Sequence, residues 1–78
     1  MWIGGSQPSD AEIAATASVV VEHFQGDLDA AAIWLRGEAI RFLRAGDLRR
    51  NLIAVRLYRF IKPQLMQQNR AQKAYKET

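Results

Sequence analysis

The sequence predicts an all-α fold, a small three-helix bundle, from two observations. Apolar residues recur every three or four positions over three segments, a spacing typical of amphipathic helices. Two short connectors, Gly26-Asp27 and Gly46-Asp47, separate these segments, and each joins a glycine that can end a helix to an aspartate that can begin one. Because β-branched runs are short, strand signals are weak. We expect helices near residues 10–25, 28–45 and 48–62.

The first helix is expected to begin at a capping box. In Ser9-Asp10-Ala11-Glu12 the Ser9 hydroxyl can accept the backbone N–H of Glu12, and the Glu12 carboxylate can reach back to Ser9. Before this box, residues 1–9 contain Gly4, Gly5 and Pro8 and are expected to form a flexible lead-in. Gly26 is the expected left-handed stop. The apolar face of the helix is formed by Ile13, Ala17, Val20, Val21 and Phe24.

The second segment carries the main core stripe and a second apolar stripe on its opposite face. Either Asp27 or Asp29 can cap this helix. The second stripe consists of Ile33, Gly37 and Ile40, with Trp34 near its edge. We interpret Gly37 as a site of close helix contact, since an interior glycine costs about 1 kcal/mol relative to alanine. The alternative is a tolerated glycine between two ordinary exposed isoleucines. The expected core residues are Leu28, Ala31, Ala32, Leu35, Ala39, Phe42 and Leu43.

The third segment is apolar on two faces and contains a proline near its end. One face holds Ile53, Ala54, Leu57, Phe60 and Ile61, and the other holds Leu48, Leu52 and Val55. Pro63 lacks a backbone donor and clashes with the carbonyl of Arg59, so the helix should end near Lys62 or kink there. A fourth helical segment after Pro63 stays open. The expected domain spans residues 10–68, followed by a polar, basic tail at residues 69–78.

The surplus of apolar surface predicts an oligomer. A helix with two apolar faces must be central in its domain or covered by a partner, and two other helices cannot surround the third. A homodimer is the simplest answer, because symmetric pairs are the commonest oligomers. The other answer is a larger protein with an acidic surface, which this chain would regulate or inhibit. The expected interface residues are Ile33, Trp34, Arg36, Gly37, Ile40, Arg41, Arg44, Ile53, Leu57 and Phe60.

Charge is divided unevenly along the 78-residue chain, whose net charge is +3. Residues 1–35 hold five acidic residues and no Lys or Arg, giving −5, whereas residues 36–78 hold all 11 basic residues and three acids, giving +8. The first helix could therefore lie against the basic helices of its own chain. Alternatively, the division indicates a polyanionic partner, or head-to-tail pairing of two copies through the acidic first helix.

Nucleic-acid binding is the alternative function. The segment around Ala45-Gly46-Asp47 resembles the helix-turn-helix family over about twenty residues, with Gly46 in the turn and Leu52 and Val55 at suitable core spacings. The resemblance implies a second helix that enters the major groove. The segment departs from the pattern at Phe42 and Asp47, where that family favours a small and an apolar residue. The expected phosphate contacts are Arg49, Arg50, Arg56 and Arg59.

Composition argues against several other classes. Without Cys, and with His23 as its one histidine, the chain has neither disulfides nor the ligands of a typical zinc site, so we expect no metal and no cofactor. No nucleophile or phosphate-loop pattern appears, so we expect no enzyme. No apolar run approaches the length of a membrane span, and a cytoplasmic location is expected. The predicted function is a non-enzymatic protein–protein interaction module.

Overall fold

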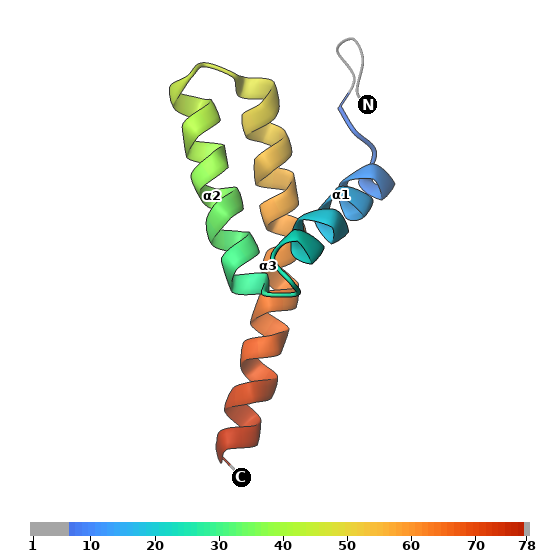
Figure 1. Cartoon of the computed structure of the whole chain (residues 1–78), viewed down its shortest axis with the longest axis vertical. Helices are drawn as coiled ribbons and strands as arrows, with labels where there is room; N and C mark the ends of the chain where they lie inside the picture. The colour runs from blue at the N-terminus through green and yellow to red at the C-terminus, as the bar shows by residue number, and fades with distance from the viewer. Residues whose placement is uncertain (1–6, 78) are drawn as a thin grey trace.

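Three α-helices make up the computed structural model, which describes residues 7–77, with side chains described as far as residue 71. They are α1 (Asp10–His23), α2 (Leu28–Arg44) and α3 (Leu48–Glu77), and residues 7–77 contain no strand. The all-α three-helix prediction is confirmed. As Figure 1 shows, α2 runs antiparallel beside the first half of α3, and α1 crosses α3 near its middle. Most of the predicted lead-in, residues 1–6, lies outside the described residues.

The ends of α1 follow the predicted capping chemistry. The Ser9 hydroxyl accepts the Glu12 N–H at 3.2 Å, and the Glu12 carboxylate accepts the Ser9 N–H at 3.1 Å. At the other end Gly26 has a φ of +83°, and Gln25 is also left-handed with a φ of +57°. Asp27, rather than Asp29, caps α2, since its carboxylate accepts the Ala30 N–H at 3.1 Å.

A tight turn joins α2 to α3 and sets their antiparallel packing. The Gly46 N–H donates to the Leu43 carbonyl at 3.1 Å and the Asp47 N–H donates to the Phe42 carbonyl at 2.9 Å, the two bonds of a Schellman motif. Gly46 has a φ of +77°, which an L side chain rarely adopts. The Asp47 carboxylate then accepts the Arg50 N–H at 3.1 Å and begins α3. We call α2 and the first half of α3 the hairpin.

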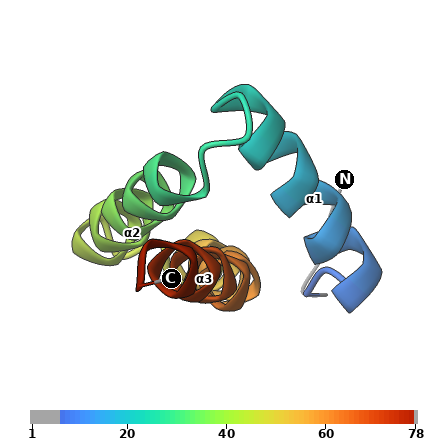
Figure 2. The same cartoon turned by 90° about the horizontal axis from the view of Figure 1, so that it is seen from below.

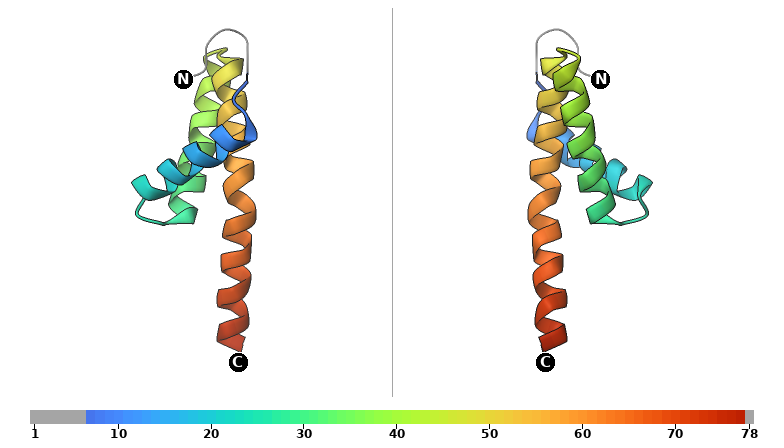
Figure 3. Two further views of the ribbon diagram at one scale, coloured as in Figure 1. Left: turned by 90° about the vertical axis from the view of Figure 1, so that its right-hand side faces the viewer. Right: turned by 90° about the vertical axis from the view of Figure 1, so that its left-hand side faces the viewer.

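The helix that begins at Leu48 does not end near Lys62. It continues through Pro63 to Glu77, so the segment after the proline is the second half of α3 and not a separate helix. The proline removes one backbone donor, and the residues that follow it are mostly good helix formers such as Gln, Ala, Lys and Leu. The Gln64 side-chain amide donates to the Phe60 carbonyl at 3.4 Å. Figure 3 shows this half of α3 extending beyond the other two helices.

The core lies where the three helices meet. Leu35 and Ile61 are the largest fully buried side chains, and neither contacts water appreciably, with 1% and 0% exposure. Leu43 is an exception to the predicted core stripe of α2, because it is 55% exposed. It lies at the edge of that stripe, and it is not among the α2 residues that line the groove toward α1, which include Trp34 and Phe42. The core cluster comprises Ile13, Ala17, Ala31, Ala32, Leu35, Ile53, Leu57 and Ile61.

Candidate interaction surface

Apolar side chains lie exposed on the side of the hairpin away from α1. Their exposed fractions are 65% for Ile33, 44% for Ile40, 55% for Leu43, 64% for Leu48 and 44% for Leu52. At about 100° per residue, they lie roughly 80–180° around their helices from the buried Leu35 or Ile61. Since α2 and α3 are antiparallel, these positions face the same side of the hairpin. We call these five residues the exposed hairpin surface.

The middle of α2 offers room for another backbone at this surface. Gly37 lies between Ile33 and Ile40, and no other part of the chain comes within 4 Å of where its Cβ would be. The predicted close contact at Gly37 is therefore not made within the chain. Arg36 and Arg44 are exposed on the same helix, whereas Arg41 is held by Glu38, to which its Nε donates at 3.1 Å. The apolar side chains of α2 thus have a basic rim.

The remaining predicted interface residues are divided between the core and a groove. Ile53 and Leu57 are buried, at 9% and 6% exposure, because α1 crosses the face of α3 on which they lie. They are therefore core residues and not part of an outer surface. Trp34 is 45% exposed at the edge of α2, with its ring centroid 5.9 Å from that of Phe24. Phe60 is 40% exposed on α3.

A largely apolar groove of about 310 Å³ runs between the three helices. Trp34 and Phe42 come from α2, Val20 from α1, and Ile53 and Leu57 from α3. Figure 2 shows α1 and α2 on different sides of α3, an arrangement that leaves this groove between them. The two buried residues of α3 thus form part of the groove wall.

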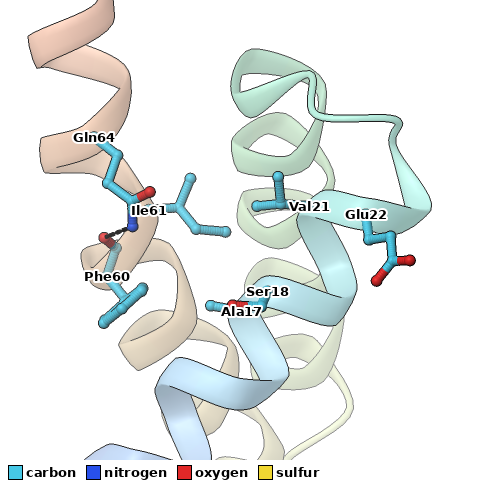
Figure 4. A pocket seen from close by; sticks show the side chains of 7 residues that line it. All are labelled: Ala17, Ser18, Val21, Glu22, Phe60, Ile61 and Gln64. Carbon is cyan, nitrogen blue, oxygen red and sulfur yellow. Dashed lines mark hydrogen bonds between the residues drawn. The ribbon is translucent and has the colours of Figure 1, made fainter.

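A second cavity, of about 250 Å³, lies between α1 and α3 (Figure 4). Ala17, Val21 and Ile61 give it an apolar wall, and the Gln64 amide is bonded to the Phe60 carbonyl beside it. Glu22 points away from the cavity in Figure 4. Glu22 is the one carboxylate among the described residues that line this cavity.

Two of the four arginines considered for phosphate binding are held by other groups of the chain. Arg56 donates to the Pro8 carbonyl at 2.7 Å and to Asp10 at 2.9 Å, and Arg50 lies 3.5 Å from the Asp47 carboxylate. At about 100° per residue, Arg49, Arg56 and Arg59 lie within about 80° of one another on α3, and Arg56 and Arg59 line one pocket beside Asp10. Arg50 lies about 100° or more away from them around the helix. The antiparallel packing of α2 and α3 in Figure 1 also differs from the steep crossing of a helix-turn-helix motif, about 90–120°.

The molecule exposes more surface than its mass requires. A compact monomer of 8.8 kDa exposes about 4,800 Å², whereas this chain exposes 5945 Å². Its radius of gyration is 14.2 Å, against about 11.5 Å for a compact domain of this length. The second half of α3, which extends beyond the other two helices (Figure 3), contributes to this excess.

Three residues of the exposed hairpin surface were not among the expected interface residues. The sequence predicts Leu43 as a core residue, and it predicts a second apolar face of the third helix that includes Leu48 and Leu52 without indicating what covers it. The sequence does contain an indication of this surface, because the second and third helices each have two apolar faces. What the sequence lacks is the position at which α1 crosses α3, which decides which of the two faces is covered.

The described residues hold few groups suited to chemistry. Residues 7–71 contain no group of three or more His, Cys, Asp or Glu side chains that could hold a metal ion. His23 lies in the last turn of α1, where its ring meets that of Phe24 edge-on at 5.2 Å between centroids. In the described part of the chain, no helix combines the length and the apolar character needed to traverse a bilayer.

The comparisons with known proteins return no match to a family model, to a curated protein or to a solved structure. Function is therefore inferred from the geometry of the chain itself.

Proposed function

We propose that the chain is a non-enzymatic interaction module that associates with a protein partner through the exposed hairpin surface. The observation that supports this most directly is the exposure of five large apolar side chains on one side of the α2–α3 hairpin. A single exposed leucine is ordinary, whereas apolar residues gathered on one face are typical of a binding surface.

The simplest partner is a second copy of the chain. A small domain has a thin margin of stability, and burying apolar surface between copies increases it. The other candidate is a larger protein with an acidic surface, whose carboxylates would pair with the basic rim formed by Arg36 and Arg44. The aliphatic stems of these arginines can pack beside Ile40 while their guanidinium groups pair with carboxylates.

Sedimentation equilibrium of the full chain over a range of concentrations tests self-association. We expect the wild-type mass to exceed that of a monomer and Ile40→Asp to weaken association at least about tenfold, because a charge would be buried without a partner. Gln68→Asp, at an exposed position in the second half of α3, is the matched control and should associate like the wild type. The far-UV circular dichroism of both variants should remain helical. A wild-type chain that stays monomeric at every concentration would contradict self-association.

A further inference from the structure

The outer face of α1 has a chemistry complementary to that of the hairpin. It consists of Ala11, Ala15 and Val19, flanked by Glu12 and Glu22, and all five residues are exposed. The helix α1 contains three acidic residues and no Lys or Arg. From Arg36 to Lys62 the chain carries eight basic residues and two acids. One surface is thus apolar with an acidic rim and the other apolar with a basic rim.

These two surfaces do not meet within one chain. The helices α1 and α2 lie on different sides of α3, so their outer faces are directed away from each other (Figure 2). The ion pair between Asp10 and Arg56 is the one that joins α1 to the hairpin among the described residues. Glu22 forms no ion pair in this part of the chain. Glu22 is therefore the acidic residue of this face on which the inference rests.

We propose that the exposed hairpin surface of one copy receives the outer face of α1 from a second copy, so that copies associate head to tail. This inference rests on the proposed function and names the partner of that same surface. The carboxylate of Glu22 would then lie near the guanidinium groups of Arg36 or Arg44 of the next copy. Opposite charges at the rim of an interface orient the partners and favour the correct pairing.

Pairing the exposed hairpin surface with itself is disfavoured by charge. A symmetric contact places a surface against its own copy. Two copies of the same basic rim, with Arg36 and Arg44, would then lie in one interface, and like charges in an interface oppose association. Pairing unlike surfaces places each basic rim against an acidic one.

The shapes of the two surfaces permit a close approach. On α1, Ala11 and Ala15 extend little from the helix, and Val19 is 65% exposed. On α2, the space above Gly37 is free of other atoms to 4 Å. Helices with small residues at their contact can pack with their axes about 8 Å apart. Val19 would enter the gap between Ile33 and Ile40.

A head-to-tail contact leaves one free surface at each end of a pair, so the average mass should keep rising with concentration beyond that of a dimer unless a ring closes. Complementation of blocked variants tests this directly. Val19→Asp blocks the face of α1 and Ile40→Asp blocks the hairpin, so each variant alone should associate at least about tenfold more weakly than the wild type. An equimolar mixture should form a 1:1 heterodimer, visible by native mass spectrometry, that does not grow further.

The outcomes separate this inference from the proposed function. If Ile40→Asp prevents association and Val19→Asp does not, the hairpin surface is an interface but α1 is not its partner, and the inference is overturned alone. If each variant alone is monomeric and the mixture is too, the contact is symmetric and the inference is again overturned. A wild-type chain that never associates overturns both. A 1:1 heterodimer from the mixture that does not grow further with concentration supports the inference.

Charge provides a second, independent measurement. Glu22→Arg should weaken wild-type association more than Glu22→Gln does, because the first change adds repulsion and the second only removes attraction. Glu22→Arg combined with Arg36→Glu and Arg44→Glu should recover part of the loss. If the two Glu22 variants associate as strongly as the wild type, the carboxylate does not face the arginines and the proposed pairing is wrong.

Discussion

Arg56 of α3 fastens the beginning of α1 to the hairpin through Asp10, whose carboxylate accepts from the Arg56 Nη2 at 2.9 Å. The same guanidinium donates through Nη1 to the Pro8 carbonyl at 2.7 Å. These contacts join residues 46 and 48 positions apart in the sequence. They occupy one of the arginines that the sequence offered for phosphate binding, and their role here is structural.

Removing this guanidinium should loosen α1. We expect Arg56→Met to lower the free energy of unfolding by about 1 kcal/mol, because the part-buried bond to the Pro8 carbonyl is lost while the apolar stem is retained. Urea unfolding followed by circular dichroism measures the change. Asp10→Asn, which alters only the exposed partner, should have the smaller effect. Equal stability of Arg56→Met and the wild type would show that the contact contributes nothing.

Two glycines should respond to alanine in opposite directions. Gly37→Ala should raise the free energy of unfolding by about 1 kcal/mol, since the position is helical and the added methyl meets no atom within 4 Å. Gly46→Ala should lower it by about 1 kcal/mol or more, because the φ of +77° is strained for alanine. Thermal unfolding should show shifts of about 4–8 °C in the two directions. If both variants shift the unfolding temperature in the same direction, either Gly37 is not an ordinary helical position or Gly46 does not require a left-handed backbone.

Adding bulk at Gly37 should separate stability from association. Gly37→Leu replaces a poor helix former with a good one at an exposed position, so the monomer should be at least as stable as the wild type. The larger side chain would fill the gap between Ile33 and Ile40 and weaken association. Sedimentation measures the second effect and thermal unfolding at low protein concentration measures the first. An unchanged sedimentation profile would place the interface elsewhere.

Buried and exposed isoleucines should differ in the cost of losing one methylene. Ile61→Val should lower the free energy of unfolding by about 1 kcal/mol, since Ile61 has 0% exposure. Ile40→Val, at 44% exposure, should change it by about 0.5 kcal/mol or less. Both are measured in urea at protein concentrations low enough to keep the chain monomeric. Comparable losses would indicate that Ile40 is covered by another part of the chain.

Replacing Pro63 should affect α3 locally. Pro63→Ala restores a donor for the Arg59 carbonyl, so amide hydrogen exchange in residues 64–71 should slow. Global unfolding should change less, because in this stretch Leu65 is the residue that packs against the core. Leu65→Ala provides the contrast, since it should lower global stability without slowing exchange. If Pro63→Ala leaves amide exchange in residues 64–71 unchanged, the proline does not lower the local stability of this part of α3.

Local chemistry explains why the helix boundaries at Ser9, Asp27, Gly46 and Asp47 were predictable from the sequence. A cap depends on residues within one turn, and those residues are adjacent in the chain. Periodicity likewise identified Ile13, Ala17 and Leu35 as core residues, because a helical wheel gives the angle of each side chain.

The errors arise where the answer depends on a distant element. A wheel gives the direction of Leu43 or Ile53 but not which helix lies in that direction. Ile53 and Leu57 lie on the face of α3 that α1 covers, whereas Leu43 lies on the side of the hairpin away from α1. Of the two outcomes expected at Pro63, an end of the helix is wrong, since the helix-forming residues around the proline compensate for one lost hydrogen bond, whereas the kink stays a prediction.

The unequal contacts of α1, which touches α3 more than it touches α2, have a consequence for how the chain folds. The α2–α3 hairpin needs only a tight turn and nearby pairings, so it can form first, and α1 must close a loop around the whole of α2 before it reaches α3. Helical proteins with mostly local contacts fold in microseconds to milliseconds. We expect rapid folding in which docking of α1 is the later step, so destabilising substitutions in α1 should mainly speed unfolding.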